Sequence, residues 1–84
     1  MIRYRPHAEE AIRARGLARE WVEAVVTQPD WTEIDPRHPE RTRSYKAMDA
    51  LDGRILRVVH WLEGADVVVL TAHPDRDAVK RRPR

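Results

Sequence analysis

A segment of nine residues, 54–62, constrains the fold more than any other part of this chain. Alternate residues of an extended segment point to opposite sides, and here both sides are largely apolar, with Ile55 and Val59 on one and Leu56 and Val58 on the other. A strand with two apolar sides needs a neighbouring strand along each edge and other elements over both faces. The segment therefore predicts the central strand of a small sheet.

The flanking segments predict the neighbours of this strand. Residues 42–48 favour a strand before it and residues 67–72 favour one after it, and both are rich in residues common in sheets. Asp52-Gly53 is the best signal for a two-residue hairpin loop between the first two of these strands. Residues 31–35 predict a further short strand, and residues 1–5 indicate an optional edge strand.

The first third of the chain predicts two short helices. Pro6 suits a first helical position and Gly16 suits a left-handed helix end. Apolar residues repeat at helical spacing on both sides of Gly16, and Pro29 closes the second repeat. Helices followed by hairpin-linked strands predict an α+β domain, in which two N-terminal helices pack on a three- to four-stranded antiparallel sheet.

The basic residues are unevenly distributed along the 84 residues, a length that suits one domain. We expect a single domain at residues 1–79 and a basic C-terminal tail at residues 80–84, which holds four of the sixteen basic groups. Residues 1–79 contain the other twelve basic groups and all fourteen acidic groups, so this body carries a formal charge of −2. Such a body is not the strongly cationic surface of a non-specific nucleic-acid binder.

Several classes of protein are excluded or disfavoured. The chain has no cysteine, which excludes disulfides, thiolate zinc sites and cysteine nucleophiles. Its four histidines lack metal-ligand spacing and its glycines form no phosphate-binding loop, so we expect no metal and no cofactor. The longest apolar run, Val67-Val68-Val69-Leu70, is far short of a membrane span, and no secretion signal is evident. We expect a cytoplasmic protein with no membrane partner.

Short motifs resemble a known family, the domain of unknown function 4258 family. The motifs that resemble the opening of that family are His7-Ala8, Arg15-Gly16-Leu17, Trp21-Val22 and Pro29. Residues 53–59 and 68–72 resemble its two closing strands. The resemblance runs from about His7 to Arg76 and implies a RelE/ParE-like toxin fold. Several such toxins cut RNA with arginine, lysine, histidine or tyrosine side chains and no metal. It thus implies a metal-independent endoribonuclease or RNA-binding module with RNA and an antitoxin-like protein as partners, although Ala11 stands where the family commonly carries arginine.

Metal-free RNA cleavage needs a base, an acid and cations that neutralise the charge developing on phosphorus. We predict His7 as base or acid and Arg15 and Arg57 as the cations, because Arg57 is the one charged residue on an apolar strand side. We expect these three side chains to meet around one open hollow. Residues predicted to bind RNA are Lys46, Arg54, His73 and Arg76.

The same side chains also have structural interpretations. His7 suits a helix cap, Arg15 suits a helix C-terminus, and Arg57 suits an ion pair with Glu10 or Glu23 that clamps helix to sheet. Those roles favour a non-catalytic protein-interaction domain. A third alternative is a toxin-like binder of a protein target. An exposed edge strand is also compatible with a homodimer.

Overall fold

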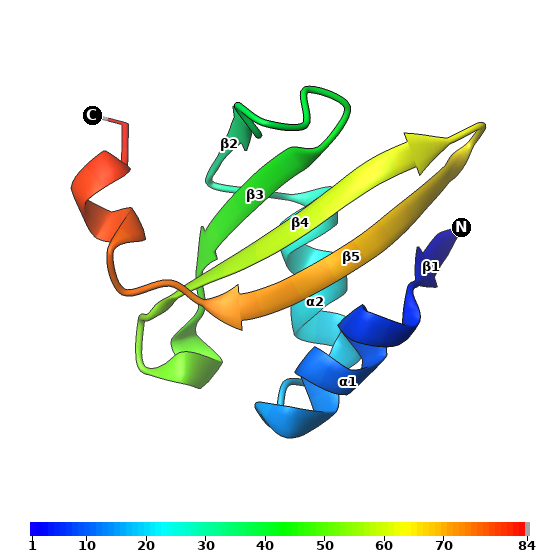
Figure 1. Ribbon diagram of the computed structural model, residues 1–84. Helices are drawn as coiled ribbons and strands as arrows, with labels where there is room; N and C mark the ends of the chain where they lie inside the picture. Colours follow the sequence, from blue (N-terminus) through cyan, green and yellow to red (C-terminus); the bar gives the residue numbers. More distant parts are fainter. Residues whose placement is uncertain (84) are drawn as a thin grey trace.

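The computed structural model describes residues 1–83, which form two helices, five strands and two short 3-10 helices (Figure 1). The strands are β1 (Ile2–Tyr4), β2 (Trp31–Ile34), β3 (Thr42–Ala47), β4 (Ile55–Glu63) and β5 (Asp66–Pro74). The helices are α1 (Pro6–Ala14) and α2 (Arg19–Thr27), and the 3-10 helices are η1 (Asp49–Leu51) and η2 (Ala78–Arg81). Neither helix of the described chain combines the length and the apolarity that a bilayer crossing needs.

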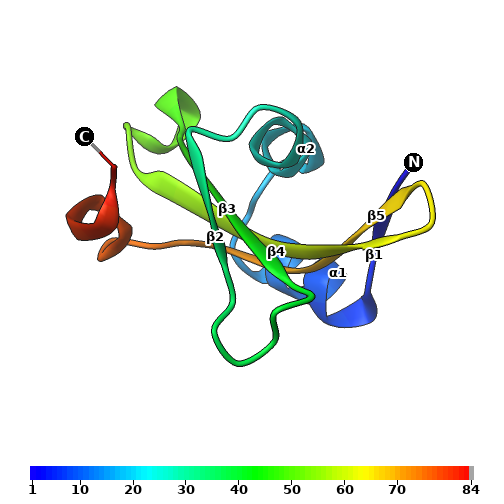
Figure 2. The same cartoon turned by 90° about the horizontal axis from the view of Figure 1, so that it is seen from above.

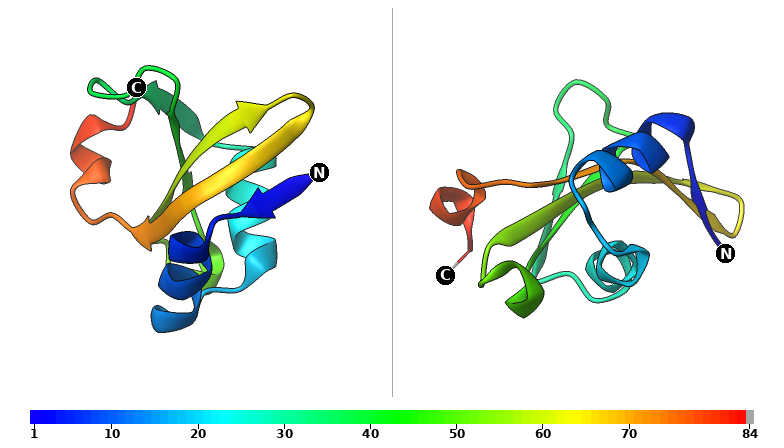
Figure 3. Two further views of the ribbon diagram at one scale, coloured as in Figure 1. Left: turned by 45° about the vertical axis from the view of Figure 1, so that its right-hand side comes forward. Right: turned by 90° about the horizontal axis from the view of Figure 1, so that it is seen from below.

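The five strands form one mixed sheet in the order β1-β5-β4-β3-β2. The α+β class is confirmed, and β2 to β5 are antiparallel, but the sheet has five strands and is mixed, because the optional edge strand forms as β1 and pairs parallel to β5. Ile2 pairs with Val67 and Tyr4 with Val69, and β1 lies at the opposite side of the molecule from η2 (Figure 3). No hairpin links β1 to β5, so no turn imposes an antiparallel direction on this pair.

The central position of β4 between β3 and β5 is confirmed. Its pairing with β5 shifts register after Val59: Val59 pairs with Thr71 and His60 with Val69, which leaves Leu70 as an extra residue. Such a bulge strengthens the local twist of a sheet.

The helices cover the even-numbered side of β4. Seen from above, α2 lies on one side of β3 and β4 (Figure 2). Both helices contribute to one apolar cluster with Leu56 and Val58 of β4 and with Val69 and Ala72 of β5. Burying such side chains supplies the main stabilising free energy of a domain this small.

The other side of the sheet is called the open face here. It carries the strand residues that point away from the helix cluster: Trp31, Glu33, Arg43, Tyr45, Ala47, Ile55, Arg57, Val59, Trp61, Val68, Thr71 and His73. At one end η2 covers it, because the fully buried Ala78 packs with Trp31, Tyr45 and Ile55. The predicted basic tail thus begins inside η2, and its last residue, Arg84, lies outside the described residues.

The connection between β3 and β4 differs from the predicted two-residue hairpin. It spans residues 48–54, because residues 49–51 form η1 before the chain turns. Asp52 and Gly53 then both take left-handed backbone angles, with φ of 57° and 80°. The turn signal was therefore correctly placed, but the loop is longer than two residues.

Candidate functional site

A hollow of about 590 Å³ opens where β5 ends and β4 begins. Its walls come from the end of α1, from the β3–β4 connection and from the segment that joins β5 to η2 and runs beyond it. We call it the arginine hollow, because its lining includes Arg15, Arg54, Arg76 and Arg82.

The arginine hollow is a cationic site. Among residues 1–83, no ion pair involves Arg15, Arg54 or Arg76. Arg82 has a distant partner, with Nη2 at 3.7 Å from an oxygen of Asp30. Asp75 is the one carboxylate among the lining residues. The hollow therefore offers several unneutralised guanidinium groups to an anionic ligand.

A row of three side chains on the open face lies next to the hollow. Tyr45 on β3 pairs with Arg57 on β4, and Arg57 pairs with His73 on β5, so all three point to the same side. Arg57 Nη1 lies 3.5 Å from Oδ2 of Asp75, which itself lines the hollow. Asp75 therefore lies between the row and the hollow and contacts both.

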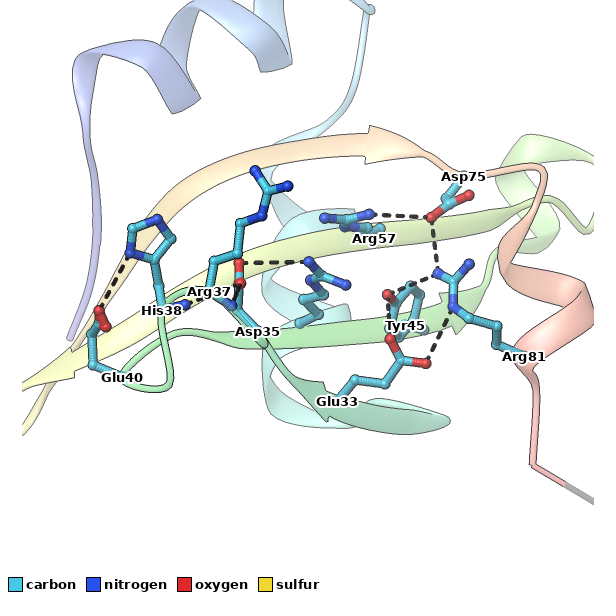
Figure 4. Close-up of polar contacts among 10 residues, drawn as sticks. Glu33, Asp35, Arg37, His38, Glu40, Tyr45, Arg57, Asp75 and Arg81 are labelled. Atoms are coloured by element: carbon cyan, nitrogen blue, oxygen red, sulfur yellow. Dashed lines mark hydrogen bonds and ion pairs between the residues drawn. The ribbon is translucent and has the colours of Figure 1, made fainter.

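Asp75 belongs to a polar network that fastens η2 to the sheet (Figure 4). Its Oδ2 also lies 3.4 Å from Nη2 of Arg81, and its Oδ1 accepts a hydrogen bond from the backbone N–H of Asp77 at 3.0 Å. Burial works to raise the pKa of Asp75, but this N–H and the two guanidinium groups outweigh it and lower the pKa below its usual range. Asp75 is therefore ionised at neutral pH.

His73 is the histidine that pairs with Arg57 across β4 and β5. Its pKa is lowered first by burial and then by the positive charges of Arg57 and Arg15, against the opposite pull of Asp75. A lowered pKa keeps the ring neutral at pH 7, and a neutral imidazole has a nitrogen that accepts a proton. His73 therefore has the electronic state that a general base requires.

The structure gathers five of the seven sequence-predicted site residues. Arg15, Arg54 and Arg76 line the hollow, and Arg57 and His73 lie on the open face beside it. His7 is exposed in the first turn of α1 and does not line the hollow. Lys46 lies on the other side of the sheet, where its Nζ donates to the Gln28 carbonyl at 2.9 Å.

The expected clamp between Arg57 and a helix carboxylate is not formed. Arg57 pairs with Asp75 instead of Glu10 or Glu23, because its side chain lies on the face opposite α2. His60 lies on the helix side, as its spacing from Arg57 indicates, and its Nε2 is 2.8 Å from Oγ of the buried Ser44. Burial lowers the pKa of His60.

Sequence reasoning missed Asp75, Arg81 and Tyr45 as members of this region. Tyr45 could have been placed beside Arg57 by pairing the two predicted strands in register, because cross-strand partners share a face. Arg81 carried no such signal, since it was grouped with a basic tail. No group of three or more acidic or histidine side chains within residues 1–83 is placed to hold a metal ion.

Comparison with curated proteins gives no match, and comparison with solved structures gives none either. One family does match: the family described as "Domain of unknown function (DUF4258)" aligns with residues 4–74. That span contains both helices, strands β2 to β5, and the residues Arg15, Arg54, Arg57 and His73. Because the match covers far more than half of the chain, the protein belongs to the DUF4258 family.

Proposed function

We propose that the protein is an RNA-binding module that holds RNA phosphates in the arginine hollow. The observation that carries the proposal is that Arg15, Arg54 and Arg76 come from three separate segments and line one hollow, without ion-pair partners within the described chain. Other arginines of the described chain are paired with carboxylates, as in Arg3–Glu63 and Arg19–Glu9, and those outside the hollow that have no ion pair do not line a common cavity with it.

RNA fits this site for two reasons. The planar guanidinium fork of arginine matches phosphate oxygens in two-point hydrogen bonds. The RelE/ParE-like toxin fold that the family resemblance implies favours RNA over other phosphate polymers, because several such toxins cut RNA. The acidic balance of the rest of the body supports binding at one defined place, since phosphate is repelled from acidic surfaces.

The test measures the affinity for a fluorescein-labelled single-stranded RNA by fluorescence anisotropy at several salt concentrations. The double variant Arg54→Gln/Arg76→Gln is expected to bind more weakly, and its salt slope is expected to fall by about 0.7 for each phosphate that the protein no longer neutralises. The control is Arg13→Gln/Arg37→Gln, which removes two exposed arginines that do not line the hollow. Equal losses in both double variants would contradict the site, and no RNA affinity at all would favour the protein-interaction alternative.

A second candidate function, metal-independent cleavage of the bound RNA, is favoured by the neighbouring positions of His73 and Arg57. In this proposal His73 takes the base role that sequence analysis gave to His7. His73 accepts the proton of a ribose 2′-hydroxyl while the 2′-oxygen attacks phosphorus and the bond to the 5′-oxygen breaks. Arg57 and Arg15 neutralise the charge on the phosphate oxygens, and the 5′-oxygen leaves with a proton from water.

Cleavage is tested with end-labelled RNA in the presence of EDTA, which removes metal-dependent contaminants. The expected products carry a 2′,3′-cyclic phosphate and a 5′-hydroxyl, and His73→Gln is expected to abolish them while RNA affinity is kept. A substrate with 2′-deoxyribose at the cut site must resist cleavage. Cleavage that persists in His73→Gln would remove this residue from the base role.

A further inference from the structure

We infer that RNA held in the arginine hollow continues across the open face and stacks a nucleobase on Trp61. This inference rests on the proposed RNA-binding function and deepens it, because it names a base-contacting residue at a distance from the phosphate site. Its first support is the path itself. Ile55 lines the hollow at the start of β4, and Trp61 lies six positions further along the same side of that strand, about 20 Å away at ~3.3 Å per residue.

Three arginines lie along this path. Arg57 lies on β4, Arg43 on β3 pairs with Val59, and Arg41 precedes β3 beside Trp61. Two of them are held by carboxylates: Arg57 Nη1 is 3.5 Å from Asp75, and Arg43 Nη2 is 3.6 Å from Asp35. These pairs fix the two guanidinium groups over the sheet, so part of the entropy cost of ordering them is already met before a ligand arrives.

The same three arginines have unused hydrogen-bond donors. The Nε–H groups of Arg41, Arg43 and Arg57 are buried and have no partner in the structure. A ligand therefore reaches these arginines through the exposed part of each side chain, which is 22 % for both Arg43 and Arg57. Phosphate and ribose oxygens of a polynucleotide are hydrogen-bond acceptors, spaced repeatedly along one chain. Three arginines placed one after another along this face therefore favour a chain-like ligand over a single small anion.

Trp61 is held in place at the far end of this path. Its Nε1–H donates to Oε2 of Glu63 at 3.0 Å, and Glu63 is itself paired with Arg3 at 2.7 Å. The Arg41 guanidinium lies 5.7 Å from the ring centroid, near the ~6 Å outer limit of a cation–π contact. The indole is thus fixed at its edge and partly exposed, with Arg41 over one side of the ring, which leaves the rest of its exposed surface for a base to stack on.

The other two tryptophans do not offer such a surface. Trp31 stacks on Tyr45 with ring centroids 4.7 Å apart and is buried in the cluster that includes Ala78 of η2. Trp21 packs against the helix-side cluster. The partly exposed ring of Trp61 lies on the open face beyond the end that η2 covers. Trp61 is therefore the tryptophan that we assign to base stacking.

The experiment compares two probes: a single-stranded RNA of about ten nucleotides and an abasic ribose-phosphate chain of the same length. Trp61→Leu is expected to weaken RNA binding by about 5- to 150-fold, the range given by one stacked base, and to leave binding of the abasic chain unchanged. RNA is also expected to quench tryptophan emission of the unaltered protein but not of Trp61→Leu. The matched control is Leu62→Ala, which removes the next side chain, 72 % exposed and on the other side of β4.

The outcomes separate the two proposals. Equal effects of Trp61→Leu on both probes, or no effect on either, would overturn base stacking while the arginine hollow stands, provided that Arg54→Gln/Arg76→Gln weakens both probes. If the unaltered protein binds neither probe, the RNA-binding function itself fails, and base stacking fails with it. Circular dichroism of Trp61→Leu establishes that a loss of affinity does not arise from unfolding.

Discussion

Arg81 and Tyr45 meet on the open face although 36 positions separate them, with Nη2 of Arg81 donating to the Tyr45 hydroxyl at 3.1 Å. The same hydroxyl donates to Glu33 at 2.9 Å, and Arg81 also lies 3.4 Å from Glu33 and from Asp75. These contacts raise the pKa of Arg81 and keep it charged. The segment that carries η2 is therefore fastened by a polar network in addition to the burial of Ala78.

Removing the Tyr45 hydroxyl tests how much this network stabilises the fold. Tyr45 is fully buried, so Tyr45→Phe removes two hydrogen bonds without opening a cavity. We expect the free energy of unfolding to fall by about 2 kcal/mol or more in urea denaturation, since each of the two bonds contributes about 1 kcal/mol and both partners are charged. Lys80→Ala, an exposed change in the same 3-10 helix, is the control and is expected to have no effect. A Tyr45→Phe protein as stable as the original would show that the network contributes nothing.

The pairing of Arg57 with Asp75 is measured by a double-mutant cycle. Both side chains are mostly buried, at 22 % and 12 % exposure, so we expect a coupling energy of about 1–2 kcal/mol between Arg57→Ala and Asp75→Ala. The exposed pair Arg3–Glu63, at 48 % and 46 % exposure, is expected to couple by less than about 1 kcal/mol. Stability is read from urea unfolding. If the exposed pair couples more strongly than the buried one, the importance assigned to Asp75 is wrong.

His60 makes stability depend on pH. Burial lowers its pKa from the ordinary value of 6.5, so the folded state binds a proton less readily than the unfolded state. The stabilising contribution is complete above 6.5 and is lost as the pH falls through the folded-state pKa. We expect the free energy of unfolding to decrease on acidification through this interval, and to decrease less steeply in His60→Gln. Identical slopes in the two proteins would contradict the assignment.

Position 53 favours glycine because of its backbone angle and not because a larger side chain would collide with a neighbour. Its φ is 80°, and a Cβ added there would meet nothing within 4 Å, so Gly53→Ala is expected to lower stability by about 1–2 kcal/mol through backbone strain alone. At the preceding residue, Asp52 also has a positive φ, of 57°, and Asp52→Gly is expected to cause no loss. Thermal unfolding of both variants provides the comparison. A Gly53→Ala protein with an unchanged melting temperature would show that the loop rearranges freely.

The sequence predicted those parts of the fold that local chemistry determines. The alternation of residues 55–62 located the central strand, and Gly16 located the end of α1, where its φ is 63°. β1 was harder, because three residues carry too short a pattern and its partner is remote in the chain. The buried position of Ala78 in η2 was hidden by the four basic residues around it at 80–82 and 84.

The candidate site was predicted only in part, for a geometric reason. His7 and Arg15 are eight positions apart, so an α-helix separates them by about 12 Å along its axis even where they share a side. Arg15 lies just past the end of α1, at the hollow, whereas His7 lies at the other end. Arg57 and His73 share a face only because β4 and β5 pair in one particular register, which a single sequence does not specify.

The parallel pairing of the first strand with the last has a consequence for synthesis in the cell. Residues 2–4 are synthesised before their strand partners at 67–69, which follow only after more than sixty further residues have been added. Contacts so distant in sequence form slowly, because a long loop must close before any of them contributes. The nascent chain therefore completes its sheet only after residues 67–69 have emerged, and residues 2–4 lack their β5 partner until then.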